Sequence, residues 1–292
     1  MSSLTIQPIG TRQSIWGEGP LWWQNRLLYV DIEGHSIVVW DPVSNIELVY
    51  SVGERVGMVT PASDGNWIFA GDNGITHFNP TTGEKRVLAD PEAAKRPHNR
   101  FNDGKCDPQG RLWAGTISTI KQTGDAALYR FDPKAGCQAM LTGLTNSNGL
   151  CWSPCGSIMY HIDTPTKQVR AYDFDGKTGS ISNQRVVVDT DKLKLEGSPD
   201  GMTIDDKGHL WIALCHGGAV VGVDPARGDE ILELIEFPTI ETTSCCFGGE
   251  GWDQLYVTTG KPPKDKPSNA LDGYVFVVNG LGVKGIPTVP LG

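Results

Sequence analysis

One short pattern, a turn containing Gly or Asn that leads into an apolar strand, occurs six times along the 292-residue chain. The first apolar residue of each copy serves as an anchor. The anchors are Leu27, Trp67, Leu112, Ile158, Leu210 and Leu255, which lie 40 to 52 residues apart. This spacing is the period of a β-propeller blade, which contains about four short strands. The sequence therefore predicts an all-β fold, a six-bladed β-propeller.

A second repeat follows the first five anchors as a strand and then a tight turn, such as Phe131–Gly136. Proline presets φ at one corner of such a turn and glycine permits positive φ at the other, so each turn is expected to join the outer strands of a blade. The sixth unit ends in the apolar strand 274–277 and a glycine-rich tail, 280–292. We expect the segment 4–6 to complete this last blade, which makes residues 1–292 a single domain.

The composition agrees with a turn-rich soluble chain. Glycine accounts for 36 of the 292 residues, about 12 % against an average near 7 %, and with proline it interrupts every helical pattern. A helical bundle is therefore excluded. No apolar run approaches the roughly 18 residues of a membrane span, and residues 1–4 do not begin a signal peptide. We expect a cytoplasmic protein that has no contact with membranes.

The net charge limits the classes of partner that we expect, and the cysteine content indicates the redox compartment. The net charge is −9, and Lys and Arg are dispersed, so the basic surface of a nucleic-acid-binding protein is not expected. A small polar substrate fits better, with the protein a monomer or weak dimer. The seven cysteines have no zinc-site spacing, and we expect buried free thiols in a reducing compartment.

Residues at the same phase of the repeat should form a ring around the central channel, because the innermost strand of every blade lines it. Four of the six in-phase pairs contain an acid or an amide, although such pairs are also common in turns. Oxygen donors from several blades suit one divalent cation, Ca²⁺, Mg²⁺ or Mn²⁺, and an oxygen-only site also accepts Zn²⁺ or Fe²⁺. Counting back nine or ten residues from each anchor gives Glu18-Gly19, Gly57-Met58, Asn102-Asp103, Asn148-Gly149, Asp200-Gly201 and Cys245-Cys246.

Arg100 and Asn102 are two residues apart on an extended segment, so their side chains should share a face and both meet a ligand. Asp103 should then point away. We expect Asp103 and Asp107 to accept hydrogen bonds from backbone N–H groups of the nearby turns.

A nucleophilic serine is not expected. The chain has no Gly-x-Ser-x-Gly motif, and its six histidines fall at unrelated phases of the repeat. His98 and His216 are expected to be ordinary loop or strand histidines.

Five motifs, in order along the whole chain, resemble those of the senescence-marker-protein/gluconolactonase/regucalcin-like family of sugar lactonases. They are 16–22 (WGEGPLW), 100–116 (RFNDGKCDPQGRLWAGT), 147–150 (SNGL), 199–202 (PDGM) and 280–285 (GLGVKG). The resemblance implies a six-bladed propeller with one divalent metal ion in the channel mouth. It also implies that Glu18, Asn148 and Asp200 are metal ligands, with Asp200 doubling as general base, and that Arg100 and Asn102 bind substrate.

The expected reaction is metal-dependent hydrolysis of a sugar (aldono-)lactone to the aldonic acid, a carboxylic-ester hydrolysis in carbohydrate metabolism. The metal would polarise the lactone carbonyl and Asp200 would accept the proton of the attacking water. One departure is that several family members carry a substrate-contacting Glu after the Gly-Thr motif, where this chain has Gly115–Lys121 with no acid. Two alternatives are an organophosphate or other ester hydrolase with the same metal cup, and a non-catalytic calcium-binding or scaffold propeller.

Overall fold

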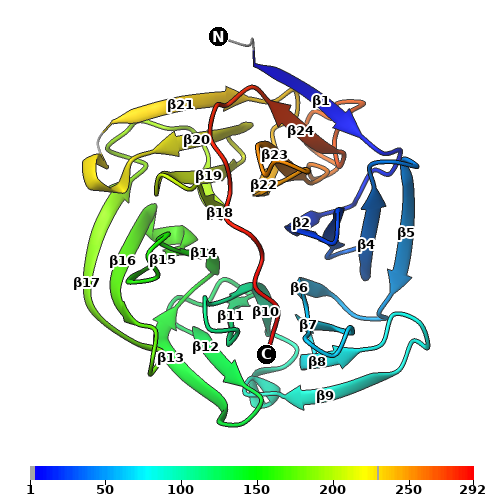
Figure 1. Ribbon diagram of the computed structural model, residues 1–292, viewed down its shortest axis with the longest axis vertical. Helices are drawn as coiled ribbons and strands as arrows, with labels where there is room; N and C mark the ends of the chain where they lie inside the picture. The colour runs from blue at the N-terminus through cyan, green and yellow to red at the C-terminus, as the bar shows by residue number, and fades with distance from the viewer. Residues whose placement is uncertain (1–3, 229) are drawn as a thin grey trace.

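A computed structural model describes residues 4–228 and 230–292 and shows six four-stranded antiparallel sheets arranged in a ring (Figure 1). Each sheet is one blade, and its first strand in sequence is the innermost in five of the six. The predicted six-bladed β-propeller is confirmed.

The strands follow one another from the channel outward in each blade. The first three blades contain β2 (Gly17–Trp23), β3 (Arg26–Asp31), β4 (Ser36–Asp41) and β5 (Ile46–Ser51); β6 (Val56–Pro61), β7 (Trp67–Gly71), β8 (Gly74–Phe78) and β9 (Lys85–Ala89); β10 (Asn99–Cys106), β11 (Leu112–Ser118), β12 (Ala126–Asp132) and β13 (Gly136–Leu144). The next two contain β14 (Ser147–Trp152), β15 (Ile158–Asp163), β16 (Gln168–Asp175) and β17 (Ser180–Asp189); β18 (Ser198–Ile204), β19 (Leu210–Cys215), β20 (Ala219–Val223) and β21 (Ile231–Glu236). The last contains β22 (Thr242–Gly248), β23 (Gln254–Thr259), β24 (Val275–Asn279) and β1 (Thr5–Ile9).

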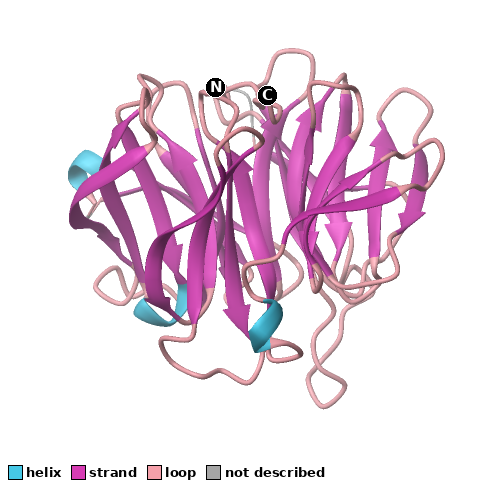
Figure 2. Ribbon diagram, turned by 90° about the horizontal axis from the view of Figure 1, so that it is seen from below, coloured by secondary structure: helices cyan, strands magenta, loops and turns pink. Residues whose placement is uncertain are grey.

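The strands stand upright around the ring, and the loops gather at its two ends (Figure 2). Three short 3₁₀ turns, η1 (Ala93–Lys95), η2 (Thr164–Thr166) and η3 (Pro225–Arg227), lie in connections. No helix among residues 4–228 and 230–292 is long and apolar enough to cross a membrane.

The core lies between neighbouring sheets, which explains the apolar anchors. Every anchor lies at or next to the start of the second strand of its blade. The fully buried Trp113 fills one such wedge, because its ring meets Trp152 at 6.0 Å and Phe174 at 6.0 Å, both from the next blade. At the join between the first and last blades, Trp22 stacks on Tyr256 at 5.2 Å. Large flat side chains suit a gap that widens outward.

The ring is closed by strands from opposite ends of the chain. β1 pairs antiparallel with β24, from Thr5 opposite Asn279 to Ile9 opposite Val275. The strand thus runs over residues 5–9, further than the expected 4–6. This pairing covers the outer edge of β24, which would otherwise expose unpaired backbone groups.

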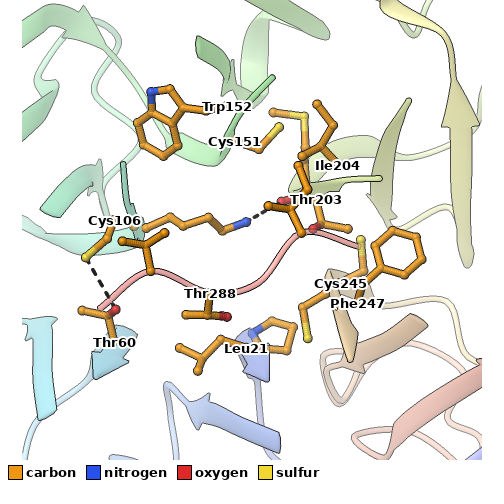
Figure 3. A pocket seen from close by; sticks show the side chains of 18 of the residues that line it. Leu21, Thr60, Cys106, Cys151, Trp152, Thr203, Ile204, Cys245, Phe247 and Thr288 are labelled. Carbon is orange, nitrogen blue, oxygen red and sulfur yellow. Dashed lines mark hydrogen bonds between the residues drawn. The ribbon is translucent and has the colours of Figure 1, made fainter. Parts of the chain in front are cut away.

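The glycine-rich tail crosses one end of the channel as a strap, visible in red across the centre of Figure 1. Its backbone is tied to four blades, with contacts that include Gly285 N to Trp252 O at 2.7 Å and Leu291 N to Pro61 O at 2.9 Å. Beneath it lies a cavity of about 180 Å³, where Thr288 of the strap faces Leu21 and Thr60 (Figure 3). The strap therefore covers the end of the channel where the innermost strands finish.

All seven cysteines are free. Five of them are buried, as expected, but Cys137 is half-buried and Cys155 is exposed.

Candidate functional site

Each innermost strand contains a bulge at the same phase of the repeat. In β2 the pairing with β3 shifts between Glu18 and Leu21, and matching shifts occur in β6, β10, β14, β18 and β22. A bulge leaves residues out of the ladder and redirects their side chains. Glu18 directly precedes the bulge of β2, and the other five bulges contain Gly57, Asn102, Asn148, Asp200 and Thr243.

Counting from the anchors is thus correct for five blades and wrong for the sixth. Thr243 and Ser244, rather than Cys245 and Cys246, occupy the ring position there, because β22 continues one residue further beyond its bulge and the anchor Leu255 is the second residue of β23. The Thr243 hydroxyl donates to the backbone oxygen of Gly17 at 2.5 Å. It therefore ties the last blade to the first.

The ring lies at the opposite end of the channel from the strap. Glu18, Asn148 and Asp200 are near the beginnings of β2, β14 and β18, whereas the strap bonds to residues that follow the ends of innermost strands. All three side chains are buried.

Two glycines let innermost strands pack closely, Gly149 between the fourth and fifth blades and Gly201 between the fifth and sixth. A Cβ at Gly149 would lie 2.6 Å from the backbone oxygen of Asp200, and one at Gly201 would overlap the Ser244 side chain. Neither glycine has a positive φ. They are needed for close approach, and this approach places the Asn148 and Asp200 positions side by side.

Three buried carboxylates share the channel. Burial, and then the charges of Asp200 and Asp103, raises the pKa of Glu18 well above its ordinary value. Burial, and then the charge of Asp103, likewise raises the pKa of Asp200. The positive groups whose charges act on this cluster are Arg100, Lys105 and His216. Carboxylates held this close together favour either protons or a cation.

The Asn148 amide is oriented by a chain of two hydrogen bonds. Its Nδ2 donates to the Thr164 hydroxyl at 2.9 Å, and that hydroxyl donates to the backbone oxygen of Pro199 at 2.9 Å. Because a carbonyl can only accept, the Thr164 proton is committed to Pro199, and Thr164 must accept from an N–H of Asn148. The amide oxygen is therefore turned the other way, where it is buried without a hydrogen-bond partner among the residues that the structure describes.

These residues fit a divalent cation. A buried amide oxygen without a donor costs about 1–3 kcal/mol, and burial followed by the charges of neighbouring carboxylates raises the pKa of both Glu18 and Asp200. Glu18, Asn148 and Asp200 together offer only oxygen donors, as Ca²⁺, Mg²⁺ and Mn²⁺ prefer. A cation bound among them would satisfy all three groups at once.

The side chains of Arg100 and Asn102 are hydrogen-bonded to each other, not only on the same face of the strand. Arg100 Nη1 donates to Asn102 Oδ1 at 3.0 Å and to the backbone oxygen of Phe101 at 2.8 Å. Asn102 Nδ2 in turn donates to Asn146 Oδ1 at 3.1 Å and to Ser147 O at 3.0 Å. Arg100 Nε is buried with no partner. The free donor of the pair is thus on Arg100.

Asp103 departs from its expected position. The bulge between Phe101 and Asp103 breaks the alternation of β10, so Asp103 is buried beside the channel and lines the central cavity. It does accept the expected backbone bond, from Gly104 N at 2.6 Å. Asp107 is structural, as expected, because its carboxylate accepts from Gln109 N at 2.9 Å and Trp113 Nε1 at 3.0 Å.

The site has three further members that periodicity did not indicate, Cys215, His216 and Glu241. Glu241 Oε2 lies 2.6 Å from His216 Nδ1 and 3.6 Å from Cys215 Sγ. The hydrogen bond with Glu241 is the main cause that raises the pKa of His216, and burial, followed by the charge of Asp200, raises that of Cys215. His216 is therefore tied to the site, not an ordinary loop residue.

Lys121 lies exposed in the turn after β11, with a left-handed φ of 57°. Ser118 and Cys215, which end β11 and β19, pair with the first residues of innermost strands, so Lys121 and His216 follow at the same end of the channel.

Comparison with known proteins gives one family. The model of the SMP-30/gluconolactonase/LRE-like region matches residues 16–261. Regucalcin of Danio rerio is 38 % identical over 295 residues, which cover 98 % of each chain.

Solved structures of members of this family have the same fold. A luciferin-regenerating enzyme superposes with a TM-score of 0.93 at 29 % identity, covering 99 % of each chain. A calcium-binding protein, regucalcin, from Agrobacterium tumefaciens superposes with a TM-score of 0.87 at 26 % identity, covering 96 % of this chain and 95 % of that one.

Proposed function

The chain belongs to the SMP-30/gluconolactonase/LRE-like family, and from this premise we propose that it is a metal-dependent hydrolase of sugar lactones. Its substrate would be an aldonolactone and its product the aldonic acid. The family suggests lactone hydrolysis, and calcium binding without catalysis is the other activity that fits its relatives. The buried, partnerless oxygen of Asn148 beside Glu18 and Asp200 is the observation that carries the proposal.

In the proposed mechanism, Glu18, Asn148 and Asp200 hold one divalent cation. When bound, this cation supplies Lewis-acid polarisation of the lactone carbonyl and stabilises the negative charge that develops there. Asp200 accepts the proton of the attacking water as general base. The water oxygen adds to the carbonyl carbon, the ring C–O bond breaks, and a proton passes to the departing ring oxygen. Proximity compensates for the weak basicity of a carboxylate beside a cation.

Arg100 and Asn102 bind the substrate in this proposal. The free Nε of Arg100 donates to an oxygen of the lactone, and Asn102 fixes the guanidinium through the bond to Nη1. Burial, followed by the charge of Arg55, lowers the pKa of Arg100 to about 10. The guanidinium therefore stays charged at neutral pH and can form charge-assisted hydrogen bonds.

The substrate is further defined by the residues at the channel mouth. Lys121 and His216 lie there, and Gly115–Lys121 contains no acid. We propose that Lys121 contacts a hydroxyl or acidic group of the sugar. The chain is further proposed to act as one domain, 1–292, as a cytoplasmic monomer or weak dimer in carbohydrate metabolism, without nucleic acid or membrane partners.

The experiment is an assay of pentonic and hexonic aldonolactones after chelation and after adding back Ca²⁺, Mg²⁺, Mn²⁺, Zn²⁺ or Fe²⁺. A phosphotriester is assayed in parallel, because a polarised P=O resembles a polarised C=O. Faster turnover of a lactone supports the proposal. Faster turnover of the phosphotriester would favour an organophosphate hydrolase, and no turnover with any metal would favour a calcium-binding propeller.

A further inference from the structure

Three side chains with metal-binding atoms meet beside the proposed oxygen ligands Glu18, Asn148 and Asp200, and none of the three belongs to that set. The ligand atoms of Cys215, His216 and Glu241 all lie within 4.8 Å of one another. Cys215 and Glu241 are buried, while the His216 side chain is 63 % exposed. The cluster therefore has two buried members and one exposed member.

The chain brings these residues together from the end of the second strand of the fifth blade and the start of the innermost strand of the sixth. Cys215 ends β19 and forms an isolated antiparallel bridge with Glu241, which precedes β22. His216 has a left-handed φ of 63°, a conformation that ordinary side chains rarely adopt. This conformation accompanies the contact of its Nδ1 with Glu241.

We infer that Cys215, His216 and Glu241 form a second cation site, which takes Zn²⁺. Thiolate, imidazole and carboxylate are the three ligand types of protein zinc sites, whereas Ca²⁺ and Mg²⁺ prefer oxygen alone. Three protein ligands leave the fourth tetrahedral position to water, which is the composition of open zinc sites. The two sites therefore differ in the class of cation that each selects.

The distances suit such an ion. In a tetrahedral zinc site, sulfur and oxygen ligands lie about 3.5 Å apart, and Cys215 Sγ is 3.6 Å from Glu241 Oε2. The His216 Nδ1 to Glu241 Oε2 distance of 2.6 Å must widen to about 3.3 Å. Only the exposed imidazole has to move for this to happen.

The second site adjoins the first without sharing its donors. Cys215 pairs with Ser198, two residues before Asp200, so the second set of ligands lies beside the first. An ion on Cys215, His216 and Glu241 would place a second positive charge next to the carboxylate that is proposed as general base. The inference itself does not depend on lactone hydrolysis.

The test uses the full-length, chelator-treated protein, which is first saturated with Ca²⁺ and then titrated with Co²⁺ as a spectroscopic substitute for Zn²⁺. We expect one Co²⁺ per chain with a near-ultraviolet thiolate-to-cobalt charge-transfer band that Zn²⁺ abolishes. Cys215→Ser should lose the band, and His216→Asn should bind Co²⁺ at least tenfold more weakly. The matched control is Cys155→Ser, which removes the exposed thiol and should keep the band.

Several results would overturn the second site. One is the absence of a charge-transfer band in the wild-type protein, and another is an unchanged band in Cys215→Ser. A third is loss of the band in competition with Ca²⁺, which would mean that both ions share one site. Circular dichroism checks that Cys215→Ser is folded. If it is not, His216→Asn decides, because its exposed side chain is dispensable for packing. The absorption readout is independent of lactonase activity, so failure of the proposed function is seen separately.

Discussion

Thr164 determines which end of the Asn148 amide faces the channel. Its hydroxyl accepts from Asn148 Nδ2 at 2.9 Å and donates to the backbone oxygen of Pro199 at 2.9 Å. Pro199 directly precedes Asp200, so a single hydroxyl links two proposed metal ligands from neighbouring blades. The partnerless oxygen of Asn148 follows from this link.

Replacing Thr164 should therefore weaken metal binding without removing a ligand. Thr164→Val deletes the acceptor that holds the amide, so we expect about a 10- to 100-fold loss in affinity for the divalent cation. Isothermal titration calorimetry with Ca²⁺ and Mn²⁺ measures this change. Thr164→Ser keeps the hydroxyl and should retain most of the affinity. Equal affinities for the Val and Ser variants would contradict the orientation role.

Asp200→Asn should make the metal-free protein more stable while lowering its metal affinity. The folded-state pKa of Asp200 is raised, first by burial, so the favourable contribution of its protonated form is lost as the pH rises through that pKa. At pH 7 we expect the substitution to raise the free energy of unfolding by about 1–3 kcal/mol in chelator. The gain should disappear below about pH 4, where the unfolded carboxyl is protonated as well.

Urea denaturation with EDTA at several pH values measures this gain, and Asp191→Asn, at an exposed site, is the control expected to change nothing. A metal-free Asp200→Asn protein that is less stable than wild type at pH 7 would contradict the electrostatic account.

Arg100 and Asn102 should act as one unit in substrate binding. Arg100 Nη1 donates to Asn102 Oδ1 at 3.0 Å, and losing a charge-assisted bond of this kind costs about 1.5–3 kcal/mol. We expect Arg100→Lys and Asn102→Ala each to lower kcat/KM about 10- to 100-fold, mainly through KM, and the double variant to be little worse than either. Kinetics on the best lactone provide the double-mutant cycle. Additive losses would instead assign Asn102 an independent contact with substrate.

Stability should fall on mild acidification because of His161. Burial, followed by the charge of Arg170, lowers the pKa of this histidine to about 3, and its Nε2 lies 2.8 Å from the Ser147 hydroxyl. Between about pH 6.5 and 3 the unfolded chain binds a proton that the folded protein does not. This group therefore removes about 1.4 kcal/mol of unfolding free energy for each pH unit.

Unfolding in urea at pH 6.5 and 4.5 tests this expectation. His161→Gln should lose about 2 kcal/mol less than wild type over that interval, whereas His35→Gln, at an exposed position, should follow wild type. Parallel wild-type and His161→Gln curves would exclude a buried neutral histidine.

The period of the apolar anchors was sufficient to predict the number of blades and to place Glu18, Asn148 and Asp200 at one phase. Counting failed for the sixth blade because it assumes an equal distance from bulge to anchor, whereas β22 continues one residue further beyond its bulge and Leu255 is the second residue of β23. Asp103 was misplaced because the bulge in β10 breaks the alternation of side chains. Neither deviation has a signal in the residue pattern, since both arise from pairing between strands.

Cys215 and Glu241 could not be found from the sequence for a different reason. They are 26 residues apart, lie outside the in-phase ring, and meet only because the fifth and sixth blades pack together. Residues at equivalent positions of each blade recur with the period of the repeat, whereas contacts between non-equivalent positions of neighbouring blades have no period.

The most direct test of the central claim is the initial rate of aldonolactone hydrolysis, followed as acid release in a pH-stat, for wild-type protein and Asp200→Asn. Each is measured after chelation and after adding back a divalent cation. The account predicts that chelation abolishes the wild-type rate, that a cation restores it, and that Asp200→Asn stays at least 100-fold slower at saturating cation. A chelated wild-type protein at full rate, or an Asp200→Asn variant at the wild-type rate, would contradict it.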